Sequence, residues 1–271
     1  TAQWELASLL DWSPGTHPRR PLAPRDVAAA GRRGDLAGVD RLLSLGLPID
    51  GVDERGATAL LHAAGAGRTE LVRELIARGA DPLATAPNGA NALSAAIVAG
   101  RQDVLAYLLD RGLSVDRPIA GGLLPLTLAA ACQREAIVDM LLQRGARADG
   151  EGDGHQTPLR ATLLAVIERE GPLDATLRIA DNLLKHGARP DLPDAEGRSL
   201  LHGLLGAGLS EPLSRDENRI GAAVRLLASH QANLNALDRD LRTALHWACR
   251  HAFVSLAGLL LELGADPTLP D

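Results

Sequence analysis

The stretch DERGATALLHAAGAGRTELVRELIARGADP, residues 53–82, holds one complete structural unit of the chain. It opens with the turn signal DERG, whose glycine takes a positive φ at no steric cost. Thr58 then provides the N-cap of a short helix of small side chains, which Gly67 ends. A second helix carries an apolar stripe from Leu71 onward and closes at Gly79. One such helix pair cannot bury its own stripe, so the stretch predicts stacked copies.

Near-copies of the phrase Thr-Ala-Leu recur along the chain, each followed by a Leu-Leu or Leu-Ile pair and a turn. The first four copies lie 33 residues apart, and the next two follow at spacings of 42 and 44. A fixed period in this range predicts a solenoid of repeated helix pairs. The copies begin at Thr58, Asn91, Leu124, Thr157, Ser199 and Thr243.

These phrases resemble the ankyrin repeat, with its 33-residue period and Thr-Pro-Leu-His phrase. The resemblance covers residues 25–271. It implies an all-α fold, an ankyrin-type helical solenoid with short β-hairpin tips and about seven stacked units forming one elongated domain. The expected parts are an N-terminal arm with a Pro-rich spacer (1–24), a cap (25–52), and repeats at 53–85, 86–118, 119–151, 152–193, 194–237 and 238–271.

Composition narrows the class of protein. Hydrophobic residues make up 46% of the chain and aromatic residues 2%, so thin layers of Leu, Ala, Val and Ile are expected in the core. The formal charge of −6 argues against a nucleic-acid partner, because such binders carry a basic stripe. No apolar run reaches the roughly 18 residues of a membrane span, so membrane insertion is not expected.

The cysteines and the basic residues point to a compartment and a source. Cys132 and Cys249 fall on helices about three repeats apart, too far for a disulfide. Two free thiols favour a reducing compartment, and we expect the cytoplasm. Nearly all basic residues are Arg, with Lys185 the single lysine, a bias that predicts a GC-rich, bacterial genome. The chain starts at Thr1 and stops where a further hairpin would begin, so we expect a larger protein.

Two repeats contain extra residues between their helices, at 166–174 and 209–217. These insertions are either tolerated loop growth or a specific interaction on one face of the stack. We expect them to pack on each other as a flap. The N-terminal arm carries Trp4 and Trp12, and is either the tail of a preceding domain or a tethered helix that docks on the solenoid. A docked arm would complete the cap or occupy the groove.

The histidines and cysteines that could take part in catalysis or metal binding are better explained by structural roles. The resemblance implies that the imidazoles of His202 and His246 tie neighbouring hairpins together. Cys249 and His251 lie two residues apart without a second pair at ligand spacing, so no metal site is predicted. The chain has no phosphate-binding, dinucleotide-binding or nucleophile-elbow motif. We therefore expect no enzyme activity and no cofactor.

The resemblance implies a protein-interaction module that binds a protein partner on the concave surface made by hairpin tips and first helices. The alternative is a regulatory or targeting domain of a larger enzyme or receptor. Small apolar residues are expected along the groove in the early repeats and arginines in the last. First-helix positions expected to face the groove are Ala66, Ala99, Cys132, Ala165, Ala207 and His251. The predicted partner-binding residues are Glu54, Arg55, Asn88, Leu123, Gln156, Glu196, Arg198, Arg239, Arg242, Arg250 and His251.

Overall fold

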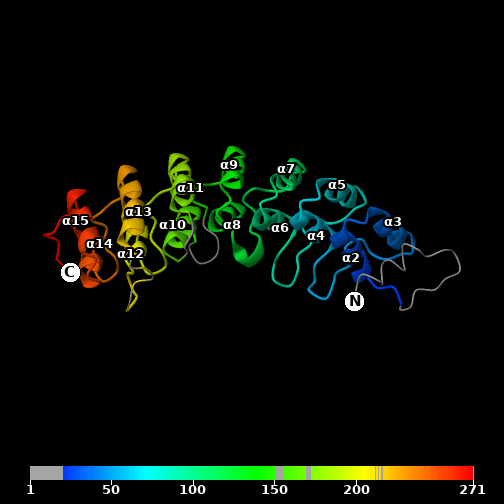
Figure 1. Ribbon diagram of the computed structural model, residues 1–271, viewed down its shortest axis with the longest axis horizontal. Coiled ribbons are helices and arrows are strands. Elements are labelled where there is room, and N and C mark those ends of the chain that lie inside the picture. The colour runs from blue at the N-terminus through cyan, green and yellow to red at the C-terminus, as the bar shows by residue number, and fades with distance from the viewer. Residues whose placement is uncertain are drawn as a thin grey trace. The chain divides into compact units, whose positions relative to one another are not determined.

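The computed structural model describes residues 21–150, 156–168, 172–210, 212, 214 and 216–270 (Figure 1). Every regular element among these residues is a helix, so the all-α fold is confirmed. The chain divides into two compact units, residues 1–121 and 122–271.

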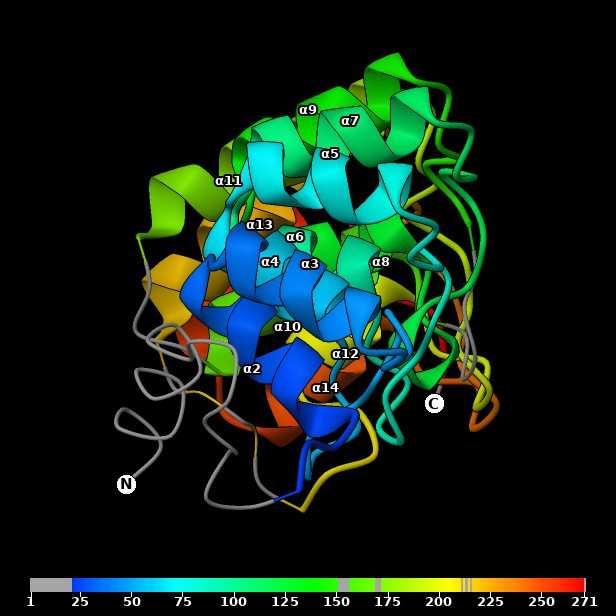
Figure 2. The same cartoon turned by 90° about the vertical axis from the view of Figure 1, so that its right-hand side faces the viewer.

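Unit 1 contains helix pairs in which the first helices pack on each other and each second helix packs on its partner. In Figure 2, α5 and α7 lie on one side of α4 and α6. The pairs are α2 (Arg25–Arg33) with α3 (Leu36–Ser44), α4 (Ala59–Ala66) with α5 (Thr69–Ala77), and α6 (Ala92–Ala99) with α7 (Gln102–Asp110).

Unit 2 continues the pattern after the short 3₁₀ turn η1 (Ala120–Gly122) at the boundary. The second helices α9, α11, α13 and α15 form one row, and α8, α10, α12 and α14 form the other (Figure 1). The bounds are α8 (Pro125–Ala131), α9 (Glu135–Gln143), α10 (Pro158–Glu168), α11 (Leu173–Lys185), α12 (Leu200–Leu204), α13 (Glu217–Ser229), α14 (Ala244–Arg250) and α15 (Val254–Glu262).

The first helices α4, α6 and α14 begin at capped residues, as the repeated phrase predicts, whereas α8 begins at Pro125 without a side-chain cap. The Thr58 hydroxyl oxygen accepts a hydrogen bond from the Leu61 backbone N–H at 3.2 Å. Asn91 and Ser94 form a reciprocal capping box, which satisfies donors at the start of α6. Each cap pairs a backbone donor of the first helical turn that would otherwise lack a partner, so these short helices start at a defined residue.

The core consists of small residues on the first helices and branched residues on the second. Ala59, Ala63 and Ala64 of α4 are fully buried, as are Val72 and Leu75 of α5. Small side chains let the first helices approach closely. The apolar stripe of each second helix then covers them, which is the burial that stabilises a stack of short helices.

An arginine before α5 and another before α7 each reach back to the first helix of the preceding repeat. Arg68 donates to the carbonyl of Arg32 at 2.7 Å, at the end of α2. Arg101 donates in the same way to the carbonyl of Gly65 at 3.2 Å, at the end of α4. A guanidinium at a helix C-terminus pairs unsatisfied carbonyls and interacts favourably with the helix dipole. Consecutive repeats are therefore joined by polar bonds as well as by apolar packing.

Within the insertion at 166–174, residues 166–168 and 173–174 are helical and belong to α10 and α11. α10 has 11 residues and α11 has 13, whereas α4 and α5 have 8 and 9. The insertion at 209–217 ends in α13, which also has 13 residues. Extra residues with helical propensity lengthen the flanking helices, because propagation adds a hydrogen bond for each residue fixed. Residues 169–171, 211, 213 and 215 lie outside the described residues, as does the arm with Trp4 and Trp12, so the flap and the docked arm stay predictions.

The tips are tight turns and not strand pairs. At the first tip the Asp53 N–H donates to the Ala57 carbonyl at 3.0 Å, and the Gly56 N–H donates to the Asp53 carbonyl at 2.9 Å. A closing bond of the same kind joins Ala86 to Ala90, Asp194 to Arg198, and Asp238 to Arg242. One closing bond gives a hairpin shape without a strand ladder, so no strand occurs in the described tips.

Candidate functional site

The first residue of the first tip, Asp53, stabilises the turn through hydrogen bonds that its carboxylate accepts. Oδ1 of Asp53 accepts from the backbone N–H groups of Arg55 and Ala57, at 2.9 and 3.0 Å. Its Oδ2 lies 2.8 Å from Nε2 of His62 on α4. Burial alone would raise the pKa of Asp53, but the hydrogen bonds from His62 and the backbone hold it below its usual value. The carboxylate is therefore charged at neutral pH and fixes the turn.

The last tip repeats this arrangement with a different partner. Oδ1 of Asp238 accepts from the N–H groups of Asp240 and Arg242, and Oδ2 accepts from the indole N–H of Trp247 at 2.8 Å. Burial works to raise the pKa of Asp238, and the bonds from Arg242 and Trp247 outweigh it, so the pKa is lowered. Trp247 thus takes the place that His62 has in the first tip. Both tips are bonded to a side chain of their own first helix, half-buried for His62 and 4% exposed for Trp247.

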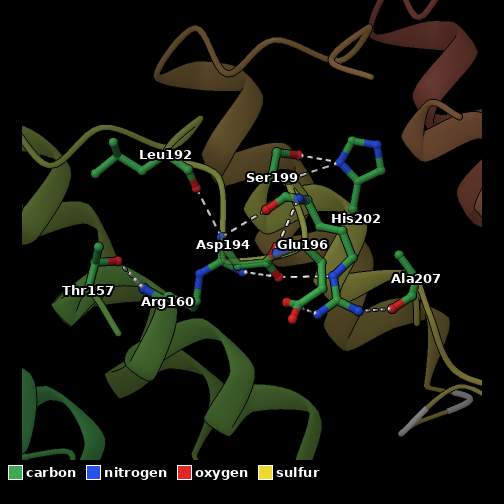
Figure 3. A network of polar contacts seen from close by, with 9 residues as sticks. Thr157, Arg160, Leu192, Asp194, Glu196, Ser199, His202 and Ala207 are labelled. Carbon is green, nitrogen blue, oxygen red and sulfur yellow. Dashed lines mark hydrogen bonds and ion pairs between the residues drawn. The ribbon is translucent and has the colours of Figure 1, made fainter. Parts of the chain in front are cut away.

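The tip at residues 194–198 is held by a wider network (Figure 3). Arg160 of α10 is only 5% exposed, and its guanidinium donates to the carbonyls of Leu192 and Arg198 at 3.0 and 3.1 Å. The same guanidinium lies 3.7 Å from Asp194, which also pairs with Arg198. Arg198 donates onward to the Ala207 carbonyl at 2.9 Å. The tip is therefore bonded to its own repeat and to the preceding first helix.

The histidines of the repeat phrase have structural partners. Nδ1 of His202 accepts from the Ser199 N–H at 3.1 Å, and its Nε2 lies 2.9 Å from the Arg242 carbonyl in the next tip. His246 accepts from the Thr243 N–H at 3.0 Å in the same capping geometry. The bond from His202 to the next tip is the tie that the resemblance implied.

The turns project their middle residues into solvent. Glu54, Arg55, Asn88, Glu196 and Arg239 are all exposed at the tips of their units. The other predicted binding residues differ in exposure: Arg250 is exposed, and Leu123, Gln156, Arg198 and Arg242 are half-buried. Part of Arg198 is used in bracing its own tip, which lowers its availability to a partner.

The structure corrects the position of His251, which was expected to face the groove. It is 6% exposed, with its ring stacked on Trp247 at a centroid distance of 5.8 Å. Its Nε2 lies 3.3 Å from the Gly206 carbonyl. Ala207, also expected in the groove, is 4% exposed. The cause is the short α12, which ends at Leu204, so the turn that follows packs over the end of α14.

A feature that the sequence did not reveal lies at the last tip. Leu241 has φ 63°, where the corresponding residues Gly56, Gly89 and Gly197 have φ 75–77°. A Leu in this left-handed region is strained. Its side chain is also 61% exposed, and Leu237 beside the turn is 47% exposed. The break in the glycine pattern at this one tip was the signal available in the sequence.

Close approach of the next tip is a second reason for glycine at this position in the earlier tips. A Cβ added to Gly56 would lie 2.2 Å from Cδ of Pro87, and one added to Gly197 would lie 3.0 Å from Cγ of Arg239. Each of these contacts is with the next tip of the same unit. A side chain at this position therefore points toward the next tip.

Two arginines lie over one indole at the last repeat. The guanidinium carbons of Arg242 and Arg250 are 5.4 and 5.6 Å from the centroid of the Trp247 ring. Cation–π contacts of this kind attract and orient a guanidinium. Arg242 also lies 3.4 Å from Asp240, whereas Arg250 and Arg239 form no ion pair with any described residue. Arg242 and Arg250 therefore both lie beside the Trp247 ring, and the basic docking point predicted here stays a prediction.

The described part of the chain contains neither a metal site nor a membrane-spanning helix. No group of three or more His, Cys, Asp and Glu side chains there is placed to hold a metal ion. Within the same residues, no helix is both long enough and apolar enough to cross a membrane.

Comparison with known proteins establishes the family. The model of "Ankyrin repeats (3 copies)" matches residues 27–119 and 173–271, more than half of the chain. The chain therefore belongs to the ankyrin-repeat family. Among solved structures, the human ASB11 ankyrin repeat domain has a TM-score of 0.67 at 21% identity, covering 89% of this chain and 99% of that one. The ankyrin repeat domain of Bcl-3, described as a unique member of the IkappaB protein family, has 0.68 at 25%, covering 87% and 97%.

The curated relatives match over short stretches. Ankyrin repeat and LEM domain-containing protein 1 homolog of Caenorhabditis elegans is 53% identical over 49 residues, 18% of this chain and 7% of the relative. Rabankyrin-5 of Homo sapiens is 36% identical over 91 residues, 33% of this chain and 7% of the relative. The aligned part is thus a small fraction of each relative. Both are animal proteins, so these matches give no support to the bacterial source expected from the arginine bias.

Proposed function

We propose that this chain is a non-catalytic module that binds a protein partner through the tips and first helices of its repeats. Ankyrin repeats are generally protein–protein interaction modules, and the family assignment supports this class of function. The proposed contacts at the tips are Glu54, Arg55, Asn88, Leu123, Gln156, Glu196, Arg198, Arg239 and Arg242, together with Arg250 on α14. His251 is left out because it is buried.

The observation that carries this proposal is the way the tips are built. Each described Asp-headed tip has a carboxylate that accepts from backbone N–H groups within the turn, while the residues at the turn's centre are exposed. A turn that is already ordered loses little conformational entropy when a partner binds it. The tips therefore present exposed charged residues on a preorganised support.

The surface of unit 1 favours an apolar contact near its first helices. Ala66 at the end of α4 is exposed, and Val98 at the end of α6 is 48% exposed. These small side chains leave room for an apolar side chain of a partner. The last repeat of unit 2 favours an electrostatic contact instead, because its arginines attract acidic residues.

We propose that the module works inside a larger protein, in a reducing compartment such as the cytoplasm. The support for the larger protein is the 7% share of each curated relative that the match covers. Cys132 and Cys249 are free cysteines, which supports the reducing compartment. The same short coverage favours the alternative that the module regulates or targets an enzyme or receptor domain attached to it.

A peptide selection tests the interaction surface and does not require the partner to be identified. Random 16-residue peptides displayed on phage are selected on the 271-residue chain, and the affinity of each winner is measured for variants of one tip at a time. Arg55→Glu and Arg239→Glu reverse charges at exposed tip residues. Arg225→Glu is the matched control, because Arg225 is exposed on the second helix α13.

We expect the charge reversals at the tips to change the affinity of the selected peptides about tenfold or more, in either direction. Arg225→Glu should leave that affinity unchanged. Folding is checked by thermal melting, since exposed substitutions shift stability by no more than about 0.5 kcal/mol. If the selected peptides respond to Arg225→Glu and to none of the tip variants, the proposed surface is wrong.

A further inference from the structure

We propose that a pocket beside the start of α6 takes one apolar side chain of a protein partner, while an adjacent carboxylate of that partner pairs with two arginines at the rim. The pocket lies within unit 1, between the segment that follows α5 and the segment that follows α7, and its volume is about 200 Å³. It is separate from the tip residues proposed above as partner contacts. The inference rests on the proposed function only in taking the ligand to be a protein.

Asn91 supplies an unused donor to this pocket. It lines the pocket and is only 6% exposed. Its Oδ1 accepts from the Ser94 backbone N–H at 2.9 Å, and its own backbone N–H donates to the Ser94 hydroxyl at 2.9 Å, so the side chain is fixed in place. Its Nδ2 bonds to no described residue. A buried amide N–H without a protein partner takes its acceptor from whatever fills the pocket.

Capping of α6 does not require this amide. The caps of α4 and α14 are Thr58 and Thr243, whose hydroxyl oxygens accept the same bond from the helix backbone. Threonine is a good N-cap and carries no amide. Asn91 therefore brings two N–H donors to the pocket that its helix does not use.

The rim of the pocket is positively charged. Arg111 and Arg117 both line it, both are exposed, and neither forms an ion pair with a described residue. Arg111 is held in place, because its Nε donates to the Tyr107 hydroxyl at 3.1 Å and its guanidinium lies 5.6 Å from the centroid of that ring. Among the described residues that line the pocket, none is acidic. A carboxylate is therefore the group that complements these donors.

The walls of the pocket favour an apolar side chain. Leu83 comes from the segment after α5, Leu113 from the segment after α7, and Leu93 from α6 itself. The volume of about 200 Å³ is below the roughly 300–1,000 Å³ of sites for drug-sized ligands, so the pocket admits a side chain rather than a helix or a whole cofactor. Side chains that fill such pockets carry a large share of the binding energy at protein interfaces.

A peptide selection with depletion tests the proposal. Random peptides displayed on phage are first depleted on a double variant, Asn91→Thr with Arg117→Gln, and the remainder are selected on the wild-type chain. The survivors should share an apolar residue next to Asp or Glu. The double variant should melt within about 3 °C of wild type, because threonine keeps the cap, as Thr58 does for α4, and Arg117 is exposed.

Titration calorimetry on synthetic survivors separates the contacts. Asn91→Thr and Arg117→Gln should each weaken binding about tenfold, and Arg117→Gln should also reduce the dependence of affinity on salt. Changing the peptide's carboxylate to its amide should weaken binding to wild type about tenfold and have a smaller effect on Arg117→Gln, because the two changes remove a shared contact. Arg225→Gln, at an exposed arginine of α13, is the matched control and should alter neither affinity nor salt dependence.

Nuclear magnetic resonance reports on the amide itself. In the chain labelled with nitrogen-15, the side-chain resonances of Asn91 are assigned by their loss in Asn91→Thr. They should shift when a surviving peptide binds, since its carboxylate or carbonyl becomes their acceptor. The side-chain resonances of Asn182 are the control and should not move, because its Nδ2 already donates to Asp139 in unit 2.

Several outcomes overturn the inference. It fails if no peptide survives depletion, if the survivors lack the apolar or the acidic residue, or if Asn91→Thr leaves their affinity unchanged. Binding of 4-methylpentanoate as tightly as the peptides would make this a small-molecule site. A dimer of the unliganded chain in sedimentation that Asn91→Thr dissociates would make a second copy the occupant.

The same experiment keeps this inference distinct from the proposed function. If undepleted winners respond to Arg55→Glu or Arg239→Glu and no peptide survives depletion, the proposed function stands and this inference fails. If peptides survive depletion while undepleted winners ignore every tip variant, the pocket is supported and the proposed tip surface is rejected. Failure of both selections rejects both.

Discussion

Nε2 of His202 lies 2.9 Å from the carbonyl oxygen of Arg242, and this contact ties one repeat to the tip of the next. The other ring nitrogen accepts from the Ser199 N–H, so the neutral ring carries its proton on Nε2 and donates it to Arg242. A protonated ring would present a second N–H to the Ser199 donor. The tie therefore requires the neutral form of a fully buried imidazole.

This requirement makes unit 2 sensitive to acid. Burial lowers the pKa of His202 below its ordinary 6.5, with partial opposition from the Arg242 carbonyl and from Asp238. The unfolded chain then binds the proton more readily than the folded chain. Stability is complete above pH 6.5 and falls as the pH drops below it, by at most about 1.4 kcal/mol per pH unit.

Urea unfolding of wild type and His202→Gln between pH 7.5 and 5 measures this effect. The variant should be less stable at pH 7.5 by about 1–2 kcal/mol and should lose less stability on acidification. Ile220→Val is the control, because it lowers stability by about 1 kcal/mol through packing and should keep the wild-type pH slope. Equal slopes for wild type and His202→Gln would contradict the prediction.

The carboxylate of Asp53 should account for much of the order of the first tip. Asp53→Ala removes the acceptor for two backbone N–H groups and for His62, and we expect a loss of about 1–2 kcal/mol in urea unfolding. Asp53→Asn keeps a carbonyl acceptor and should lose less. Hydrogen exchange at the amides of Arg55 and Ala57 should quicken in the Ala variant. Equal losses for the two variants would show that the backbone bonds contribute little.

A pair of glycines separates backbone strain from close approach. Gly56 and Gly79 both have positive φ, 75° and 91°. A Cβ at Gly56 would lie 2.2 Å from Pro87, whereas one at Gly79 would meet nothing within 4 Å. Gly79→Ala should cost about 1 kcal/mol and Gly56→Ala at least about 2 kcal/mol, by thermal or urea unfolding. Similar costs would mean that the neighbouring tip moves away freely.

Arg160 should be the most sensitive polar residue of unit 2. It is 5% exposed and donates to two carbonyls while facing Asp194. Arg160→Ala removes a donor from both carbonyls and a positive charge from beside Asp194, and we expect a loss of about 3 kcal/mol in urea unfolding. Arg189→Ala, whose side chain is 68% exposed, is the control and should lose under about 1 kcal/mol. A loss below about 1 kcal/mol for Arg160→Ala would contradict the prediction.

The repeat phrase was enough to predict the fold, because each copy contains its own cap, apolar stripe and terminating glycine. Thr58 shows this most directly, since its capping bond follows from the local sequence alone. The helical form of residues 166–168 and 173–174 was missed, because length differences between copies do not reveal whether the added residues continue a helix.

The surface was harder to predict than the fold. Exposure of Glu54 or Arg239 follows from the turn pattern, which repeats. Burial of His251 depends on the early end of α12, a tertiary effect that periodicity cannot show. Leu241 was visible as a departure from the glycine pattern, but its meaning required the backbone conformation.

Two bonds between repeats bear on how such a chain gains or loses repeats. They run from Arg68 to the end of α2 and from Arg101 to the end of α4. The repeats that contain α5 and α7 each supply an arginine to the repeat before them, and α2 and α4 supply the carbonyl acceptors. A duplicated block of one period would find a matching partner at both of its junctions. Gain of a repeat therefore preserves the bonds that join neighbours, and an array of this kind can be extended or shortened by recombination between its own copies.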